Sequence, residues 1–402
     1  MEYRKFGSID WKVSALGLGA MRLPTKKILP RVDWDESIKL IRYAIDKGIN
    51  YIDTGWIYGL GASEKVLGEA LKDGYREKVF LVTKLPMFLV RKSEDFYKYL
   101  NQQLKSLQTD YLDAYFFHGL SRNSFKKVKE FNLIEKMEEA KEKGFIKHIG
   151  FSFHDTLPVF KEIIDYYDWD LAQIQYNYMD TAVQATHEGL KYAYEKGIAV
   201  VIMEPVKGGK LANPPEEALK IMKKASKQRT PVDWALQYVW NQPEVAVVLS
   251  GMGSKKMVDE NVESASNSGI NSLNEEDNKI ISELAEIYRK SILVQCTACK
   301  YCMPCPSGVN IPENFAVLNN VAYTGEKGGM AFLINRRYKK LVGSAKKVNK
   351  EYPNGNASLC TKCGECLEKC PQEIKMPDEL EKVDAILGKG KKISEYYDMS
   401  SN

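Results

Sequence analysis

Eight short apolar runs, rich in β-branched residues, alternate with longer segments of helical periodicity between Trp11 and about Lys290. Such alternation is typical of repeated strand–helix units around a parallel sheet of the α/β class. Because eight parallel strands can close on themselves, the pattern predicts a barrel. The expected strands lie near residues 14–19, 50–53, 79–84, 112–117, 147–151, 171–175, 198–203 and 245–249.

The segments between these strands have the periodicity of amphipathic helices, and three of them end in the same way. Lys47-Gly48, Lys143-Gly144 and Lys196-Gly197 each place a basic residue in the last turn and a glycine just beyond it, which is a common helix stop. The predicted helices are 36–47, 63–71, 93–107, 131–143, 183–196 and 232–240, and a last helix at 274–290 is expected to close the domain.

Four titratable side chains stand where three of the strands are expected to end, namely Asp53, Tyr58, Lys84 and His118. In a barrel of this kind the carboxyl ends of the strands meet at one rim, which carries the chemistry. A lysine ammonium lowers the pKa of a neighbouring phenol from about 10, and a carboxylate keeps the lysine charged. Tyr58 is then a usable general acid, while a histidine can hydrogen-bond a carbonyl oxygen. The four groups therefore predict hydride attack on a carbonyl.

Each of these side chains taken alone would suit a structural role, such as capping a helix, packing at the rim or bonding in the core. Together with the stretches around them they resemble the aldo-keto reductases, and the resemblance spans residues 1–290. It implies a TIM barrel with a catalytic tetrad at these four positions. The matching stretches are 17–21, 51–55, 58–59, 82–84, 110–118, 149–152, 173–177 and 260–261.

The resemblance also implies a nicotinamide cofactor, NADP or NAD, that lies extended over the barrel mouth. Three family positions are changed: Met203 stands where many members stack an aromatic ring on the nicotinamide, Phe153 replaces an asparagine, and Met257 replaces an arginine for the 2′-phosphate. Lys255 and Lys256 can substitute for that arginine, which favours NADP. The positions that match cofactor contacts are Gly19, Ala20, Met21, Asp53, Ser152, Gln173, Met203, Pro205, Lys207, Gly251, Gly253, Ser254, Lys255, Glu260 and Asn261.

All eight cysteines follow residue 295, where the sequence becomes rich in Cys, Pro and Gly. In a reducing cytosol, clustered cysteines usually bind metal or perform redox chemistry. We therefore predict three regions: a barrel at 1–290, a mainly helical cysteine domain at 291–377 with a helical insert at 307–359, and a C-terminal tail at 378–402.

The cysteines form two frames in which three stand at two-residue intervals and a fourth precedes a proline, a spacing suited to neighbouring iron–sulfur clusters. The frames resemble a bacterial ferredoxin domain with two 4Fe–4S clusters, although the first is one residue shorter than that pattern. The alternative is a pair of four-thiolate zinc sites, which require no proline. By the ferredoxin precedent, one cluster is held by Cys296, Cys299, Cys302 and Cys370, and the other by Cys360, Cys363, Cys366 and Cys305.

The run from Arg336 to Lys350 carries basic residues and no acidic one. It is either a solvated face or a docking surface for a ferredoxin or another acidic redox partner. The formal net charge of +5 over 402 residues gives no argument for nucleic acid. No apolar run approaches the roughly 18 residues of a membrane span, and no secretory signal is visible, so a cytoplasmic protein is expected. The basic residues of the run are Arg336, Arg337, Lys339, Lys340, Lys346, Lys347 and Lys350.

Nicotinamide transfers two electrons as hydride and each cluster transfers one, so direct exchange would need a splitter such as a flavin, for which no motif is visible. Three functions remain open. The favoured one is reduction of a small aldehyde or ketone by NAD(P)H, with clusters that are structural, redox-sensing or electron-transferring. The second is a ferredoxin-linked reductase that uses single electrons from the clusters without nicotinamide. The third is a redox-responsive nucleotide-binding interaction protein, against which the complete tetrad argues.

Overall fold

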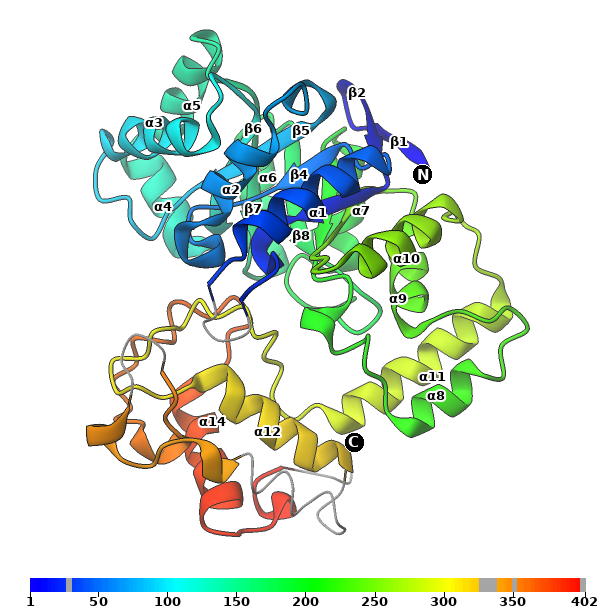
Figure 1. Cartoon of the computed structure of the whole chain (residues 1–402), viewed down its shortest axis with the longest axis vertical. Helices are drawn as coiled ribbons and strands as arrows, with labels where there is room; N and C mark the ends of the chain where they lie inside the picture. The colour runs from blue at the N-terminus through cyan, green and yellow to red at the C-terminus, as the bar shows by residue number, and fades with distance from the viewer. Residues whose placement is uncertain (27–30, 325–337, 349–352, 398–402) are drawn as a thin grey trace. The chain divides into compact units, whose positions relative to one another are not determined.

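The structure is a computed structural model that describes residues 1–26, 31–324, 338–348 and 353–397, without the side chains of residues 290 and 291. The chain forms two compact units. The first comprises Met1–Val206 and Val232–Glu275, and the second comprises Lys207–Pro231 and Glu276–Asn402. The barrel strands and the helices around them, labelled in Figure 1, belong to the first unit.

The first unit is built on a closed barrel of eight parallel strands, which confirms the predicted fold. Each strand pairs with its neighbours in sequence, and the last closes the ring against the first. All six residues of β5 are buried, as expected of a strand covered on both faces. The strands are β3 (Leu16–Gly19), β4 (Tyr51–Asp53), β5 (Phe80–Leu85), β6 (Leu112–Leu120), β7 (Ile146–Phe153), β8 (Leu171–Gln175), β9 (Ala199–Met203) and β10 (Val245–Ser250).

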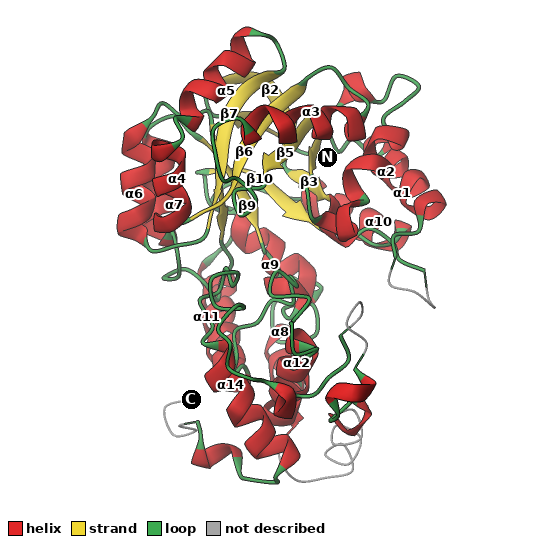
Figure 2. Cartoon of the chain, turned by 90° about the vertical axis from the view of Figure 1, so that its left-hand side faces the viewer, coloured by secondary structure: helices red, strands yellow, loops and turns green. Residues whose placement is uncertain are grey.

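Helices cover the outside of this barrel. In Figure 2, α4, α6 and α7 lie on one side of the strands, and α1, α2 and α10 on the other. The helices predicted from the periodicity are present, and α4, α6, α8 and α10 add to them. The helices of the first unit are α1 (Trp34–Asp46), α2 (Ser63–Ala70), α3 (Asp95–Leu107), α4 (Arg122–Glu130), α5 (Leu133–Glu142), α6 (Leu157–Tyr166), α7 (Thr186–Glu195), α9 (Pro231–Trp240) and α10 (Lys255–Ser266).

An antiparallel hairpin of β1 (Tyr3–Phe6) and β2 (Ile9–Ser14) packs at the amino end of the barrel strands. The ring of Phe6 meets Tyr51 and Phe80 edge to face, with centroids 5.8 and 5.1 Å apart. Tyr51 and Phe80 are the first residues of β4 and β5, so this apolar plug fills the rim that contributes stability. The opposite rim is left for the functional side chains.

The second unit is mainly helical, as predicted for the cysteine region. Its helices are α8 (Glu216–Met222), α11 (Glu275–Ser291), α12 (Ile311–Thr324) and α14 (Met376–Val383). Figure 1 shows α12 beside α14, and their buried side chains Phe315, Leu318 and Leu380 share one apolar cluster with Val309. No helix among the described residues is both long and apolar enough to span a membrane.

The second unit also contains a segment that precedes α9 in the sequence, because two contacts tie that segment to α11. Arg229 donates to both carboxylate oxygens of Asp277 at 2.6 and 3.1 Å, and Tyr288 donates to the carbonyl oxygen of Leu211 at 3.1 Å. The unit is therefore larger than the cysteine domain expected at 291–377.

Residues 378–397 also differ from the expected tail. Most of α14 lies in this range, and Val383 and Ile393 are buried in the second unit. The helical spacing of Met376, Leu380 and Val383 places three apolar side chains on one face, which gives this stretch a core to pack against.

Candidate active site and cysteine frames

The four side chains predicted to form a catalytic group meet at the carboxyl rim of the barrel. Asp53 ends β4, Tyr58 follows in the short 3-10 helix η2 (Tyr58–Gly61), and Lys84 and His118 lie near the ends of β5 and β6. Their exposed fractions range from 1% to 8%. The Tyr58 ring lies 5.1 Å from Lys84 Nζ, and its centroid lies 5.8 Å from that of the His118 ring.

The Lys84 ammonium group donates three hydrogen bonds. Its Nζ donates to both carboxylate oxygens of Asp53 and to the backbone oxygen of Thr54, each at 2.7 Å. Burial raises the pKa of Asp53 and lowers the pKa of Lys84, and the contact between the two groups opposes both shifts. All three ammonium hydrogens have acceptors, an arrangement that favours the charged form of the pair and holds the Lys84 side chain beside Tyr58.

Gly55 lets the rings of Tyr58 and His118 approach the backbone closely. A Cβ at this position would lie 3.3 Å from Tyr58 Cζ and 3.4 Å from His118 Cε1. The turn after Tyr58 passes through the left-handed region at Gly59 and Leu60, with φ of 59° and 57°. The sequence analysis did not single out Gly55, although it follows Asp53 by two residues within a matching stretch.

The surroundings of His118 favour the neutral form of its ring. Burial lowers its pKa well below the ordinary value, and the positive charge of Lys84 and the neighbouring His154 ring act in the same direction. A neutral imidazole carries one N–H donor, which suits the hydrogen bond expected from this position to a carbonyl oxygen.

Two polar side chains predicted to contact the nicotinamide lie on β7 and β8. Ser152 and Gln173 are partners across these strands, and each is 2% exposed. The Ser152 hydroxyl accepts from the backbone N–H of Gly119 at 2.8 Å, which fixes its position. Gln173 Oε1 is buried and has no hydrogen-bond partner among the described residues. A buried acceptor of this kind requires a donor, so Gln173 is available to a ligand that carries an N–H group.

The loop after β10 carries the positions expected around the adenosine. Ser254 caps α10 by accepting from the backbone N–H of Met257 at 3.3 Å, and the Met257 side chain is about half exposed. A Cβ on Gly251 would lie 3.1 Å from the side chain of Arg22. The sequence analysis missed Arg22, although a cation directly after the matching stretch 17–21 was a usable signal.

The remaining positions that the sequence predicts to contact the cofactor lie on several elements. Gly19 ends β3, and Ala20 and Met21 lie in the 3-10 helix η1 (Ala20–Arg22). Met203 ends β9 and Pro205 follows it in the first unit, whereas Lys207, which is buried, belongs to the second unit. Three further positions lie on α10: Lys255, Glu260, which pairs with Lys256 at 3.7 Å, and Asn261, which donates to Ser250 at 2.9 Å.

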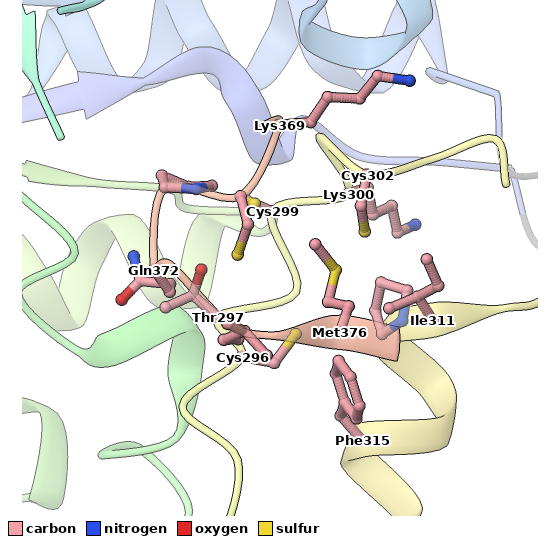
Figure 3. Close-up of a pocket in the computed structure, with 14 residues that line it drawn as sticks. Cys296, Thr297, Cys299, Lys300, Cys302, Ile311, Phe315, Lys369, Gln372 and Met376 are labelled. Atoms are coloured by element: carbon pink, nitrogen blue, oxygen red, sulfur yellow. The ribbon is translucent and has the colours of Figure 1, made fainter. Parts of the chain in front are cut away.

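The first cysteine frame surrounds a pocket in the second unit. Cys296, Cys299, Cys302 and Cys370 all line it, and Figure 3 shows the sulfur atoms of the first three facing into it while Lys369 points away. Burial raises the pKa of Cys302, and the nearby thiols of Cys299, Cys296 and Cys370 raise it further. The fourth thiol of this group comes from the second frame, which agrees with the ferredoxin precedent.

The other four thiols form a second group. Burial raises the pKa values of Cys360 and Cys366, and in both cases the thiols of Cys305 and Cys363 act in the same direction. Among the described residues, no three Cys, His, Asp or Glu side chains lie close enough to hold a single metal ion.

Residues 15–286 match the aldo/keto reductase family. The chain belongs to this family. Residues 295–376 match the 4Fe-4S dicluster domain, so this aldo/keto reductase-type oxidoreductase carries a ferredoxin-like domain after its barrel.

Two curated relatives and one solved structure illustrate the similarity. The uncharacterized oxidoreductase YqkF from Bacillus subtilis is 29% identical over 296 residues, which are 66% of this chain and 91% of that protein. L-galactose dehydrogenase from Arabidopsis thaliana is 30% identical over 291 residues, 65% of this chain and 87% of that protein. The holo form of aldo-keto reductase AKR11C1 from Bacillus halodurans aligns with a TM-score of 0.59 and 28% identity, over 71% of this chain and 96% of that one.

Proposed function

We propose that this aldo/keto reductase reduces a small aldehyde or ketone with NAD(P)H, and that Tyr58 is the general acid. The observation that carries the proposal is the position of Lys84, which is bound to Asp53 and lies 5.1 Å from the centre of the Tyr58 ring in a buried site. A cation at this distance stabilises the phenolate, so Tyr58 gives up its proton more readily than a free tyrosine. Tyr58 then protonates the carbonyl oxygen as negative charge develops on it.

The neutral His118 ring orients the same oxygen. Both this ring and that of Tyr58 pack closely against Gly55, where a Cβ would lie 3.4 Å from His118 Cε1 and 3.3 Å from Tyr58 Cζ. Two donors aimed at one oxygen polarise the carbonyl and favour the form in which that oxygen carries charge. A protonated histidine beside Lys84 would add a second buried positive charge, which the low pKa of His118 prevents.

Bound nicotinamide would supply the hydride to the carbonyl carbon. Gln173 would accept from its carboxamide NH2 and Ser152 would bond the same group, which would hold one face of the ring toward the tetrad. The adenosine end would rest on Gly251, Gly253 and Ser254. We favour NADP over NAD because Arg22, Lys255 and Lys256 are cations on or beside this loop, and a guanidinium or ammonium binds a 2′-phosphate well.

Binding and turnover test this proposal together. Protein purified without oxygen is expected to bind NADPH, as measured by fluorescence titration, and to oxidise it when a small aldehyde is added. Tyr58→Phe is expected to retain NADPH affinity and lose turnover. Turnover that survives this substitution would contradict the role of Tyr58, and the absence of NADPH binding would contradict the nicotinamide assignment.

We also propose two 4Fe–4S clusters, each held by three cysteines of one frame and one of the other. The pocket lined by the first group and the shared thiol environment of the second support this arrangement. The frames are also linked by a hydrogen bond of 3.0 Å between Ser307 and Thr361. Anaerobic preparations are expected to contain about eight iron and eight sulfide per chain, whereas about two zinc and no sulfide would contradict the clusters. Because thiols of this kind require a reducing compartment, we place the protein in the cytoplasm.

A second candidate function is favoured by one surface of the second unit. Cys363 is the exposed member of the second thiol group, and lysines 339, 340, 346 and 347 of the same unit are exposed without an ion pair among the described residues. Such a surface suits an acidic one-electron carrier such as a ferredoxin. Carbonyl reduction with reduced ferredoxin or viologen, but not with NAD(P)H, would select this function. Arg336, Arg337 and Lys350 of the predicted basic run lie outside the described residues.

A further inference from the structure

A buried carboxyl group lies behind the catalytic lysine, on the outer side of β5. Glu64 of α2 is 4% exposed. Its Oε1 accepts from the Thr83 hydroxyl at 2.7 Å and from Gln103 Nε2 at 2.5 Å. Tyr115 donates to the other polar atom of Gln103, Oε1, at 2.6 Å. Elements α2, β5, α3 and β6 thus each contribute one side chain to a single polar cluster in an otherwise apolar layer.

This cluster is connected to Lys84 through the backbone. Thr83 and Lys84 are neighbours in β5, so their side chains point to opposite faces of the sheet. Thr83 points toward Glu64 while Lys84 points into the rim. Gln103 Nε2 also donates to the backbone oxygen of Lys84 at 3.1 Å. The cluster therefore fixes the end of the strand from which the ammonium projects.

The same carboxyl group also acts on Lys84 through its charge. Burial raises the pKa of Glu64, while its bonds to Thr83 and Gln103 and the charge of Lys84 lower it. In return, the charge of Glu64 raises the pKa of Lys84, after the larger effects of burial and of Asp53. A buried carboxylate is costly unless donors and a nearby cation compensate it, and Glu64 has both.

We propose that Glu64 is a positioning residue that holds the carboxyl end of β5 and supplies Lys84 with a second negative charge from behind the strand. The inference rests on the proposed role of Tyr58 as general acid. A neutral glutamine would accept the same hydrogen bonds, so hydrogen bonding alone does not require a carboxylate here. Compared with glutamine, a carboxylate at position 64 adds a negative charge near Lys84.

The charge has a consequence that can be measured. With Glu64 ionised, Asp53, Lys84 and Glu64 carry one net negative charge, and with a glutamine they carry none. Tyr115, the other titratable group at this cluster, remains neutral because burial raises its pKa well above 10. Removing a negative charge stabilises the Tyr58 phenolate, so the pKa of Tyr58 falls. Carbonyl reduction needs protonated Tyr58, and the alkaline limb of the pH–rate profile should therefore move to lower pH.

The experiment compares Glu64→Gln with the matched control Glu69→Gln, which makes the same change at a partly exposed position of α2. In the full-length, cluster-containing protein we expect the alkaline limb of kcat to fall by roughly 0.5 to 1 pH unit in Glu64→Gln, with no shift in the control. An unchanged limb would overturn the proposal. So would a loss of rate that is equal at every pH, because that result would indicate a purely structural role.

Glu64→Asp provides a second test that does not depend on neutralising the site. It keeps the charge and shortens the side chain, so we expect a lower rate with the wild-type alkaline limb. A limb displaced to lower pH in this variant would contradict a charge effect. Failure of the proposed function itself is distinguishable, because the unsubstituted protein would then fail to reduce a carbonyl with NAD(P)H, or Tyr58→Phe would remain active.

Discussion

Gly208 and Thr297 approach so closely that no side chain fits between them. A Cβ on Gly208 would lie 2.4 Å from the backbone oxygen of Thr297, and Gly208 adopts a φ of +66°. Thr297 stands between Cys296 and Cys299 in the first frame. The backbone of this frame therefore packs directly against the segment that follows Val206. Lys210 adds a hydrogen bond of 3.1 Å from its Nζ to the backbone oxygen of Val294.

The first prediction concerns this contact. Gly208→Ala must displace the backbone of the first frame, because the clashing atom belongs to the main chain, and we expect the variant to retain about half of its iron when purified without oxygen. Gly209→Ala is the matched control. Gly209 also has a positive φ, of +92°, but nothing lies within 4 Å of its Cβ position. Equal iron content in the two variants would show that backbone strain, rather than the contact with Thr297, decides cluster retention.

The second prediction concerns the ammonium beside the phenol. Lys84→Met keeps a long side chain but removes the cation near Tyr58 and leaves Asp53 buried without its partner. We expect kcat to fall by roughly 10² to 10⁴, and the alkaline limb of any residual rate to rise because the phenolate loses its stabilising charge. Circular dichroism and NADPH affinity serve as controls for folding. A residual rate with the same alkaline limb as the wild type would show that Lys84 does not set the pKa of Tyr58.

The third prediction concerns pH. An ordinary histidine becomes protonated as the pH falls through about 6.5. Because burial lowers the pKa of His118, we expect its ring to stay uncharged over that range. We therefore expect kcat to remain flat from about pH 8 to about pH 6, without a limb from this residue. A decline centred near 6.5 that disappears in His118→Gln would contradict the neutral, buried ring.

The barrel and its tetrad were predictable from the sequence because the strands are short apolar runs, and three of them carry a titratable residue at or near the carboxyl end. The carboxyl ends of the barrel strands meet at one rim, so the sequence alone predicts that Asp53, Lys84 and His118 lie together. The cluster of Glu64 could not be predicted. Its members come from α2, β5, α3 and β6, and only the packing of helices on the strands brings them together.

The extent of the second unit could not be predicted from the sequence either. Nothing in the sequence of the segment from Lys207 to Pro231 indicates its partners, which lie on α11 and in the first frame. Tyr288 and Asp277 bind this segment across about 50 to 80 residues of sequence. The folded stretch 378–397 gives a weak signal in the sequence, because its amphipathic helix is short and most of its residues are polar.

The last prediction concerns the basic surface beside the second thiol group. The backbone N–H of Val342 donates to Asn354 at 2.8 Å, and that of Asn356 donates to Val342 at 3.0 Å, so the lysine-bearing segment lies against the residues that lead to Cys360. Reversing four exposed lysines, Lys339, Lys340, Lys346 and Lys347, to glutamate should repel an acidic carrier. We expect the rate of cluster reduction by reduced ferredoxin, followed by stopped-flow bleaching, to fall about tenfold or more at low salt.

The same change on four exposed barrel lysines, Lys65, Lys92, Lys98 and Lys126, is the matched control, because it alters the net charge equally at sites remote in sequence from the frames. Reduction by dithionite, a small reductant, should be the same in both variants, which separates docking from cluster integrity. Raising the salt concentration should abolish the difference between them, since screening shortens the reach of surface charges to about 10 Å or less at 0.1 M ionic strength. An equal loss of ferredoxin reactivity in both variants would mean that net charge, rather than the four lysines of this segment, guides the carrier.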